Sequence, residues 1–481
     1  MESSPSKVKL SVFTLMMINV AAILSLRALP GLAEYGYGLI FYLALAALAF
    51  FIPSALVSAE LASGWQGEGG VYLWVKEAFG PRWGFVAIFM QWAENLPWFP
   101  TVLAFAASAG AYIFHPALAE SKTFIVVFIW IALWGGMLLN FKGMRLSSFL
   151  STSGVISGTL APGILIVALG VAHLLSGEPS AITFSANALI PRLGNLDQLM
   201  LLATMLISFT GMEMSAAHVN EVPNPGRNYP RAIFGATLII LLLSVFGSLS
   251  IALAIPADEL SMSAGVSEAL AKVFDHHHMP WATSTVSLLM AYGALTMVIT
   301  WMVGPSKGLL QVAKEGYLPK VWQRTNKAGM PVNILIIQTV FATLFSLVIL
   351  ILPTISSAFI FMSAFAAQLY LIMYLLMFAA AIRLRYTHPD VKRPYRIPGG
   401  NAGMWVVAGT ATIACVFIIG FGFIPTSAVR AEGLGASIAY AGSLLGGCLL
   451  LTAVPLIFYH RAARNRMAIP ESELQKKERS S

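Results

Sequence analysis

The chain has 481 residues, of which 58% are hydrophobic and only 10% are charged, and its formal net charge is +8. This composition excludes an ordinary water-soluble fold, because apolar stretches of roughly 20 residues or more recur along the chain, each long enough to cross the hydrocarbon core of a bilayer as a helix. The two cysteines, Cys415 and Cys448, fall inside such stretches and supply neither a disulfide framework nor a metal site. The sequence predicts an all-α polytopic membrane protein.

Twelve membrane-spanning helices are predicted, beginning after an N-terminal segment, 1–9, that carries two lysines and is not followed by a small-residue cleavage site. Both termini are expected on the cytoplasmic side, where 24 of the 29 Lys and Arg then lie, as the positive-inside rule requires. The basic surplus is therefore a topology signal, and the expected partner is the lipid bilayer and not nucleic acid. The predicted spans are 10–33, 37–60, 82–113, 122–141, 149–176, 196–219, 230–255, 280–313, 332–353, 357–383, 403–425 and 434–459.

The spacing of the spans indicates an internal duplication. Five spans plus five would place the two halves in opposite orientations, which is the inverted-repeat arrangement of secondary transporters whose first span in each half is broken. Between spans two and three, the stretch GWQGEGGVYLWVKEAFGPRWG is too short and polar to cross the bilayer and is predicted as an interfacial or re-entrant helix. The predicted domains are 1–9, 10–176 (first repeat), 196–383 (second repeat), 403–459 (two peripheral helices) and 460–481 (cytoplasmic tail).

Several function classes are disfavoured by what the chain lacks. It contains no G-x-x-x-x-G-K-[ST] motif for an ATP-driven pump, and neither a nucleophile–base nor a metal constellation for an enzyme, so no cofactor and no metal are expected. The run His276–His278 beside Asp275 is interpreted as a solvated outer loop. An ion channel would need a pore-lining repeat and a ring of charges or carbonyls, which the sequence does not offer.

The sixth predicted span carries the polar residues expected of a ligand site. Ser208, Thr210 and Gly211 lie near mid-membrane and are followed by Glu213. Small hydroxyls and a glycine loosen a helix, and backbone groups freed in hydrocarbon must face a cavity or a ligand. An intramembrane carboxylate is a functional hypothesis by default, although a hydrogen bond to a neighbouring helix would be a purely structural alternative.

The same stretch carries a resemblance to a known family. FTGMEMSA followed by NEVPNPGRNYPRA resembles the sixth-helix signature of the amino acid–polyamine–organocation superfamily, and GEGGVYLWVKEAFGPRWGF and VGPSKGLLQVAKEGYLPKVWQRTNKAGMPVN support it. Within the superfamily, HVNEVPNPGRNYP is most similar to the glutamate/γ-aminobutyrate antiporter branch. The resemblance covers the chain from about residue 10 to about residue 460.

This resemblance implies a five-plus-five inverted-repeat core with broken helices one and six, plus two peripheral helices. The substrate carboxylate would meet backbone amides at the first break, and the amino group would meet carbonyls at the second. Glu213 matches an acidic residue connected with gating and proton coupling. The implied substrate-binding residues are Ile23, Leu24 and Ser25 at the first break, Ser208, Phe209, Thr210 and Gly211 at the second, and Trp301 in span eight. Many superfamily members have a G-S-G-type first break, whereas this chain has ILS.

Arg27 lies one turn after the first break, where an arginine costs roughly 2.5–3.5 kcal/mol on lenient insertion scales. Three interpretations compete for it. The guanidinium could bind a substrate carboxylate, for which its planar fork is suited. It could instead pair with Glu94 of span three, or reach outward to the membrane surface. Three roles are open for Glu94 as well. It could be a gating and proton-coupling group, the ion-pair partner of Arg27, or a carboxylate at the rim of the membrane.

The sequence predicts a secondary-active amino acid antiporter of the bacterial inner or plasma membrane, working by alternating access, with glutamate and γ-aminobutyrate as the leading substrates. Protons are one option for the coupling ion. The alternatives are a proton-coupled permease for neutral or cationic amino acids and, from another class, an amino-acid-binding membrane sensor, which would normally need a larger cytoplasmic output domain than the tail after residue 460 provides.

Overall fold

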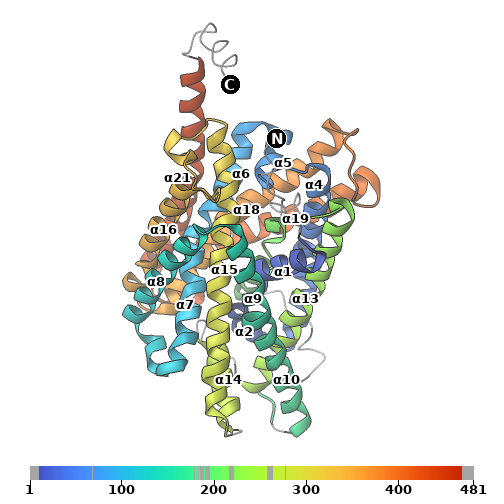
Figure 1. Cartoon of the computed structure of the whole chain (residues 1–481). Helices are drawn as coiled ribbons and strands as arrows, with labels where there is room; N and C mark the ends of the chain where they lie inside the picture. Colours follow the sequence, from blue (N-terminus) through green and yellow to red (C-terminus); the bar gives the residue numbers. More distant parts are fainter. Residues whose placement is uncertain are drawn as a thin grey trace.

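The computed structural model describes residues 10–67, 69–177, 179–182, 184, 189, 196–215, 222–256, 264–276 and 278–467. Within these residues the regular structure is helical (Figure 1), apart from one isolated bridge between Thr325 and Pro331. Eleven helical segments are long and apolar enough to cross a membrane. The predicted all-α, membrane-spanning class is therefore confirmed.

The helices follow the predicted spans closely. They are α1 (Val12–Ile23) with η1 (Leu26–Ala28) and α2 (Leu29–Ala33), α3 (Gly38–Ala46) with η2 (Ala47–Phe51) and α4 (Ile52–Gly64), α5 (Val71–Phe79), α6 (Pro81–Ala93), α7 (Asn95–Phe114), α8 (Lys122–Asn140), α9 (Met144–Val155) with η4 (Ile156–Leu160) and α10 (Ala161–Ser176), α12 (Leu196–Ile207), α13 (Pro225–Ala254), α14 (Gly265–His276), α15 (Pro280–Lys314), α16 (Val332–Ser346) with α17 (Val348–Ile351), α18 (Ile355–Thr387), α19 (Gly400–Gly422), α20 (Ser427–Ala431) and α21 (Leu434–Met467). Short 3₁₀ turns η3 (Pro116–Glu120) and η7 (Lys320–Gln323) connect some of them.

The predicted number of twelve spans is not confirmed, because the sixth differs from the others. Its helix, α12, has only 12 residues and ends at Ile207, where the backbone leaves the helical path. The rest of the predicted span continues as a 3₁₀ turn over residues 212–215 and then lies outside the described residues. A membrane helix that stops halfway needs partners for its freed backbone groups, which the site described below provides.

Local sequence signals explain where many helices begin. Ser11, Ser121 and Thr354 precede α1, α8 and α18, and each side chain accepts a hydrogen bond from a backbone amide in the first turn. The helices α6, α13 and α15 begin with proline, which needs no amide partner at that position. Gly80 has φ +88° between α5 and α6, a conformation that an L side chain rarely adopts.

The long helix α15 runs through the middle of the molecule (Figure 1) and packs against α7, α6, α8 and α9. Helix α15 approaches η4, the segment after α9, so closely that no side chain fits between the two backbones. A Cβ atom on Gly158 would lie 2.4 Å from backbone atoms of Gly293, so small residues set the distance between these two helices. The broken first span lies beside α9 and α13, and α18 packs on α19, α6 and α5.

The predicted interfacial or re-entrant segment forms α5, a separate helix whose residues Val71, Tyr72 and Trp74 are buried in the protein. Its polar side is joined to the end of α15. Lys76 Nζ lies 2.8 Å from Glu315 Oε2, and the Tyr72 hydroxyl donates to the same carboxylate at 2.5 Å. The segment is thus fixed to the core by an ion pair as well as by its apolar face.

A buried ionic cluster anchors the loop between α18 and α19. The carboxylate of Glu60 accepts two hydrogen bonds of 2.6 Å from Arg385, lies 3.5 Å from Arg393 Nε, and accepts the backbone amide of Ile397 at 2.8 Å. Arg385 also donates to the carbonyls of Ile397 and Gly400. We call this set the Glu60 cluster; it holds α4, α18 and the loop together.

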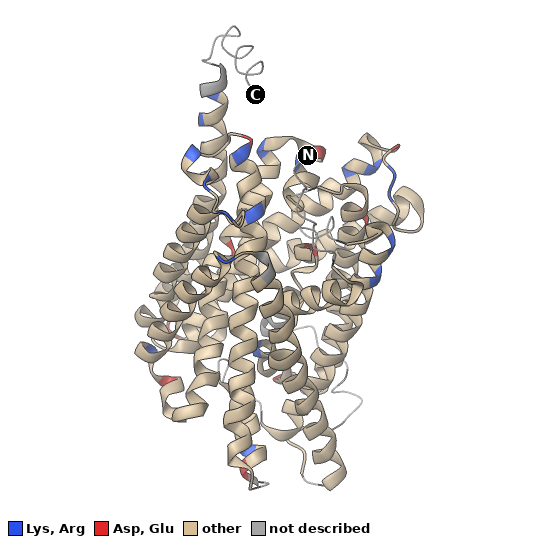
Figure 2. Cartoon of the chain, viewed as in Figure 1, with Lys and Arg blue, Asp and Glu red and all other residues tan. Residues whose placement is uncertain are grey.

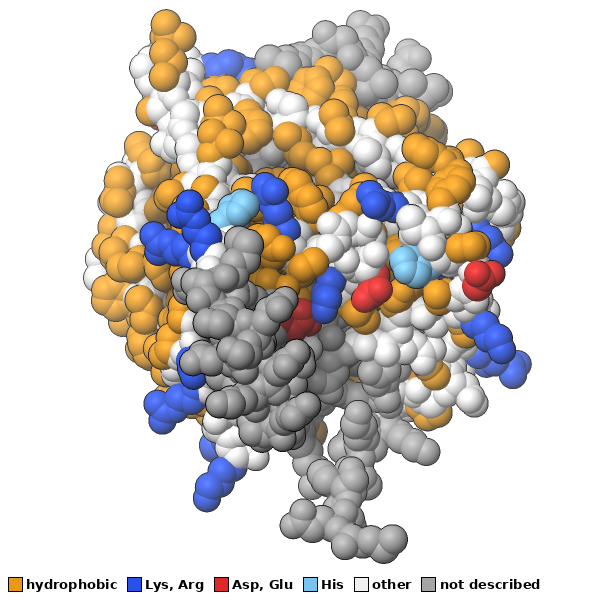
Figure 3. Space-filling model, turned by 90° about the horizontal axis from the view of Figure 1, so that it is seen from above, with side chains coloured by type: hydrophobic (Ala, Val, Ile, Leu, Met, Phe, Trp, Pro, Cys, Tyr) orange, Lys and Arg blue, Asp and Glu red, His pale blue; other side chains and the backbone are white. Residues whose placement is uncertain are grey.

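Basic residues gather at one end of the molecule. Figure 2 shows Lys and Arg concentrated around the projecting end of α21 and the α18–α19 loop, and Figure 3 shows them spread over that face. This distribution is the structural counterpart of the loop charges that the positive-inside rule assigns to one side of a membrane. For convenience we call this end the basic end.

Candidate functional site

The first span is interrupted at the predicted position. Helix α1 ends at Ile23, and both Leu24 and Ser25 are extended, with ψ of 111° and 121°. The amide of Leu24 still closes the helix onto Val20, and η1 begins at Leu26. The break is therefore short and forms without glycine, although the sequence ILS lacks the glycines typical of the superfamily. The side chain of Ser25 forms no capping hydrogen bond.

The second break follows α12. The hydroxyls of Ser208 and Thr210 donate to carbonyls of their own last helical turn, at 2.7 and 2.9 Å, and so help to close the helix. Gly211 has φ +122°, and its amide donates to the hydroxyl of Tyr374 at 2.7 Å. A side chain cannot replace this glycine easily, because a Cβ there would lie 3.1 Å from Ile23 and 3.2 Å from Trp301.

The two breaks meet at Trp301 on α15. Its indole Nε1 donates to the carbonyl of Ala22, 3.2 Å away at the end of α1, and the side chain is 2% exposed. Trp98 and Tyr370 contact the same ring, with centroid distances of 5.2 and 6.0 Å. Trp301 thus forms an aromatic cluster with Trp98 and Tyr370 and lies beside both unwound segments, and its contact with a substrate stays a prediction.

Glu213 is the polar centre of the site. Its carboxylate is buried and accepts hydrogen bonds from Gln91 at 2.9 Å, from Tyr374 at 2.5 Å and from Tyr370. Because the Tyr374 hydroxyl also accepts the amide of Gly211, one tyrosine joins the unwound backbone to the carboxylate. All three partners of the carboxylate are neutral groups, so its negative charge is stabilised without an ion pair.

The structure gives Arg27 partners that the sequence did not suggest. Its Nη1 donates to Thr101 Oγ1 at 2.6 Å, and its guanidinium lies 5.1 Å from the ring centroid of Phe359. Its Nε is buried and has no hydrogen-bond partner among the described residues. The side chain therefore points between α7 and α18 and not out to the membrane surface, and it forms no ion pair with Glu94, which is also described.

Glu94 lies at the junction of α6 and α7 and is 3% exposed. None of the hydrogen bonds among the described residues reaches its carboxylate, but it interacts electrostatically with both Arg27 and Glu213. Glu94 is thus a buried carboxylate within electrostatic reach of both the Arg27 guanidinium and the Glu213 carboxylate. Phe209 of the second break stacks on Phe51 of the second span, with ring centroids 4.7 Å apart.

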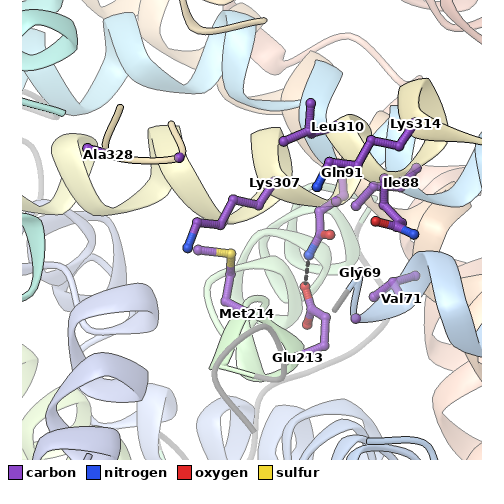
Figure 4. Close-up of a pocket in the computed structure, with 15 residues that line it drawn as sticks. Gly69, Val71, Ile88, Gln91, Glu213, Met214, Lys307, Leu310, Lys314 and Ala328 are labelled. Atoms are coloured by element: carbon purple, nitrogen blue, oxygen red, sulfur yellow. Dashed lines mark hydrogen bonds between the residues drawn. The ribbon is translucent and has the colours of Figure 1, made fainter. Parts of the chain in front are cut away.

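A cavity of about 250 Å³ leads from Glu213 towards the basic end (Figure 4). It is lined by α15, α6, the start of α5 and the loop after η7. Besides Glu213 and Gln91, its polar lining side chains are Lys307, Gln311 and Lys314. Among the described residues, no group of three His, Cys, Asp or Glu side chains is arranged to hold a metal ion. His277 of the predicted histidine run lies outside the described residues.

Sequence reasoning missed Gln91, Tyr370 and Tyr374. The two tyrosines are four residues apart in QLYLIMYLL, so they share one face of α18, and a pair of hydroxyls on one face of an apolar span was the available signal. No pattern in the sequence indicates that this face meets Glu213, which is more than 150 residues away in the chain.

Comparisons with known proteins identify the family of the chain. The profile of the amino acid permease family matches residues 10–450. An uncharacterized transporter of Legionella pneumophila is 42% identical over 94% of this chain and 97% of its own. A glutamate/gamma-aminobutyrate antiporter of Lactococcus lactis is 30% identical over 94% of this chain and 90% of its own.

A solved structure of MhsT in complex with L-phenylalanine shares the fold. It superposes with a TM-score of 0.63 at 16% sequence identity and covers 86% of this chain and 99% of the other. The chain therefore shares the overall fold of that solved structure. On the family profile and the relatives together, the chain belongs to the amino acid permease family and is a multi-pass secondary transporter.

Proposed function

We propose that the chain is an antiporter that exchanges glutamate for γ-aminobutyrate by alternating access. The observation that carries the proposal is the meeting of two unwound spans at Trp301, next to a buried carboxylate that borders a cavity. The named activity of the Lactococcus lactis relative, which aligns with nearly the whole chain, supports this substrate pair.

Substrate binding is assigned to the predicted residues around the two breaks. The amides near Ile23, Leu24 and Ser25 would take the α-carboxylate, and carbonyls of the segment from Ser208 through Phe209 and Thr210 to Gly211 would take the amino group. Trp301 would pack against the substrate's aliphatic chain. Arg27 would bind a carboxylate, since its buried Nε has no partner in the part of the chain that the structure describes.

Glu213 is proposed as the gating and proton-coupling group, and Glu94 as its partner in that role. The three donors on Glu213 are neutral, so a proton could bind the carboxylate without leaving a buried cation unpaired. Proton release could then return it to the charged form that the tyrosines stabilise. This arrangement supports the proposal that protons are coupled to exchange.

The orientation that fits these roles places the basic end in the cytoplasm of a bacterium, with both termini on that side of the inner membrane. The cavity at Glu213 then faces inward. In this proposal the segments 10–176 and 196–383 are the two inverted repeats, and 403–459 supplies the peripheral helices α19 and α21.

The test is counterflow in proteoliposomes loaded with unlabelled γ-aminobutyrate, with labelled glutamate outside. We expect saturable glutamate uptake that depends on the internal substrate. Arg27→Ala should lower this uptake about tenfold or more, the value of one charge-assisted hydrogen bond. Arg430→Ala is the control. It removes an arginine of α20, between the peripheral helices α19 and α21, and should leave glutamate uptake unchanged.

If labelled glutamate does not exchange against either compound while another amino acid does, the substrate pair is wrong and the permease family still holds. If Arg27→Ala and Arg430→Ala exchange equally well, Arg27 is not a carboxylate ligand. A dye for internal pH in the same vesicles reports whether protons move with the substrate.

A further inference from the structure

A corner of the molecule at the basic end carries two arginines that the transport site does not use. It is the turn from α5 to α6, residues 79–83, on which the end of α18 packs. Arg383 lies over the ring of Phe79, 5.0 Å from its centroid, and Arg82 lies over the ring of Trp83 at 5.4 Å. Both rings belong to one segment of five residues, whose end Cα atoms are at most about 15 Å apart. The two guanidiniums are therefore gathered at one place, which we call the arginine corner.

The aromatic rings do not supply the acceptors that these arginines need. A guanidinium has five N–H donors, and a cation–π contact offers none of them an oxygen. Neither Arg82 nor Arg383 forms a hydrogen bond or an ion pair with another residue that the structure describes, and the Nε of Arg82 is buried without a partner. Two planar donor groups without an acceptor suit the oxygens of a phosphate.

The start of α6 adds to the positive potential of the corner. Gly80 precedes this helix and has no side chain to cap it, and the first amides of a helix have no partner within the helix. The acidic residue closest in sequence, Glu77, is exposed and lies two residues before Phe79, a spacing that directs the two side chains to different sides of α5. The corner therefore favours an anion from outside the chain.

Exposed aromatic side chains place the corner at the height of the lipid headgroups. Trp83 is 40% exposed, Tyr386 of α18 is 56% exposed and Trp405 of α19 is 54% exposed. The indole of Trp405 donates to the hydroxyl of Tyr386 at 3.0 Å. Exposed Trp and Tyr side chains are typical of the boundary between hydrocarbon and water. Tyr386 follows Arg383 by three residues and shares its face of α18, so the arginine lies at the same boundary.

We propose that the arginine corner binds the headgroup of an anionic phospholipid in the leaflet at the basic end. Arg82 and Arg383 donate to the phosphate oxygens, and Trp83 flanks the lipid at the boundary. A zwitterionic lipid binds less well, because its own cation would lie near two arginines. This site goes beyond the proposed exchange function and does not depend on which compounds are exchanged.

The test is native mass spectrometry of the detergent-purified full chain, titrated with phosphatidylglycerol or with phosphatidylcholine. We expect tight binding of phosphatidylglycerol, about tenfold weaker binding by Arg383→Gln, and about a hundredfold weaker binding by the double variant Arg82→Gln/Arg383→Gln, as the loss of one and two charge-assisted hydrogen bonds predicts. The matched control is Lys392→Gln/Arg396→Gln, which removes two exposed charges from the α18–α19 loop at the same end and should bind like the unmodified chain.

Thermal unfolding of the same preparations is the second readout. Phosphatidylglycerol should raise the unfolding temperature of the unmodified chain and of the control, and much less that of the two arginine variants. Arg383 is exposed, so Arg383→Gln alone keeps the test decisive if the double variant does not fold.

Three results would overturn the proposal. Equal losses in the arginine and control double variants would mean a diffuse attraction to the basic end and no site. Equal binding of the two lipids would remove the selection for an anion. Displacement of the lipid by inorganic phosphate would mean that the corner binds free phosphate and not a lipid. None of these results bears on the antiporter proposal.

Discussion

Glu60 of α4 and Glu213 of the turn after α12 are both buried carboxylates, and the protein stabilises them in opposite ways. Glu60 is surrounded by two arginines and a backbone amide, whereas Glu213 receives only neutral donors and borders a cavity. A carboxylate paired with fixed cations cannot lose its charge without leaving those cations unpaired in a buried place. A carboxylate held by tyrosines and an amide can lose its charge without leaving a buried cation unpaired. The contrast separates a carboxylate that maintains the fold from one that can take part in transport.

The largest effect should come from breaking the fixed cluster. Glu60→Ala leaves Arg385 buried without its partner, and we expect a loss of about 3–5 kcal/mol in the free energy of unfolding. The measurement is thermal unfolding of the detergent-purified protein. Glu77→Ala, which removes an exposed carboxylate from α5, is the control and should unfold like the unmodified chain. Equal unfolding temperatures for all three proteins would mean that the Glu60 cluster does not hold the loop.

Glu213→Gln should impair transport and leave the stability of the fold nearly unchanged. The amide has the shape of the carboxylate; its oxygen can accept from one tyrosine and its nitrogen can donate to the hydroxyl of the other, so the unfolding temperature should change little. Exchange should fall by up to about a hundredfold, because an amide lacks the charge that the site uses and cannot take up a proton. Counterflow and thermal unfolding are measured on the same preparation. If Glu213→Gln unfolds at a lower temperature and transports normally, Glu213 maintains the fold and takes no part in transport.

The smallest effect is expected for Tyr374→Phe, which removes one hydroxyl and two hydrogen bonds. The amide of Gly211 and one oxygen of Glu213 each lose a partner, and exchange should fall about five- to tenfold while the fold is retained. Tyr386→Phe, an exposed tyrosine on the same helix, should have no effect. If Tyr374→Phe also has none, the link between the unwound backbone and the carboxylate does not matter for transport.

The sequence was sufficient for the class and for nearly all span boundaries, because these depend on a local property, hydropathy over about 20 residues. The expected position of both breaks came from the resemblance to the superfamily. The prediction was weakest where one segment meets another. The partners of Arg27, Thr101 and Phe359, come from two different helices far along the chain, and no periodicity indicates which faces of these helices meet.

The same limit applies to the carboxylates. Glu60 was not singled out, although a lone carboxylate in VSAELAS and an arginine in the last turn of span ten were visible, because only the packed structure brings them together. Glu213 was found through its motif, but its tyrosine donors were not. The predicted roles of the site residues remain predictions, since geometry places them and only transport measurements can assign them.

The Glu60 cluster has a practical consequence for anyone who modifies this protein. The stretch from His388 to Gly399 resembles a polar surface linker in which an affinity tag or a reporter domain would be tolerated. Its middle, however, is tied into the core through Arg393 and Ile397, so an insertion there would pull apart the ends of two transmembrane helices. A tag appended beyond the projecting end of α21 avoids that loop entirely.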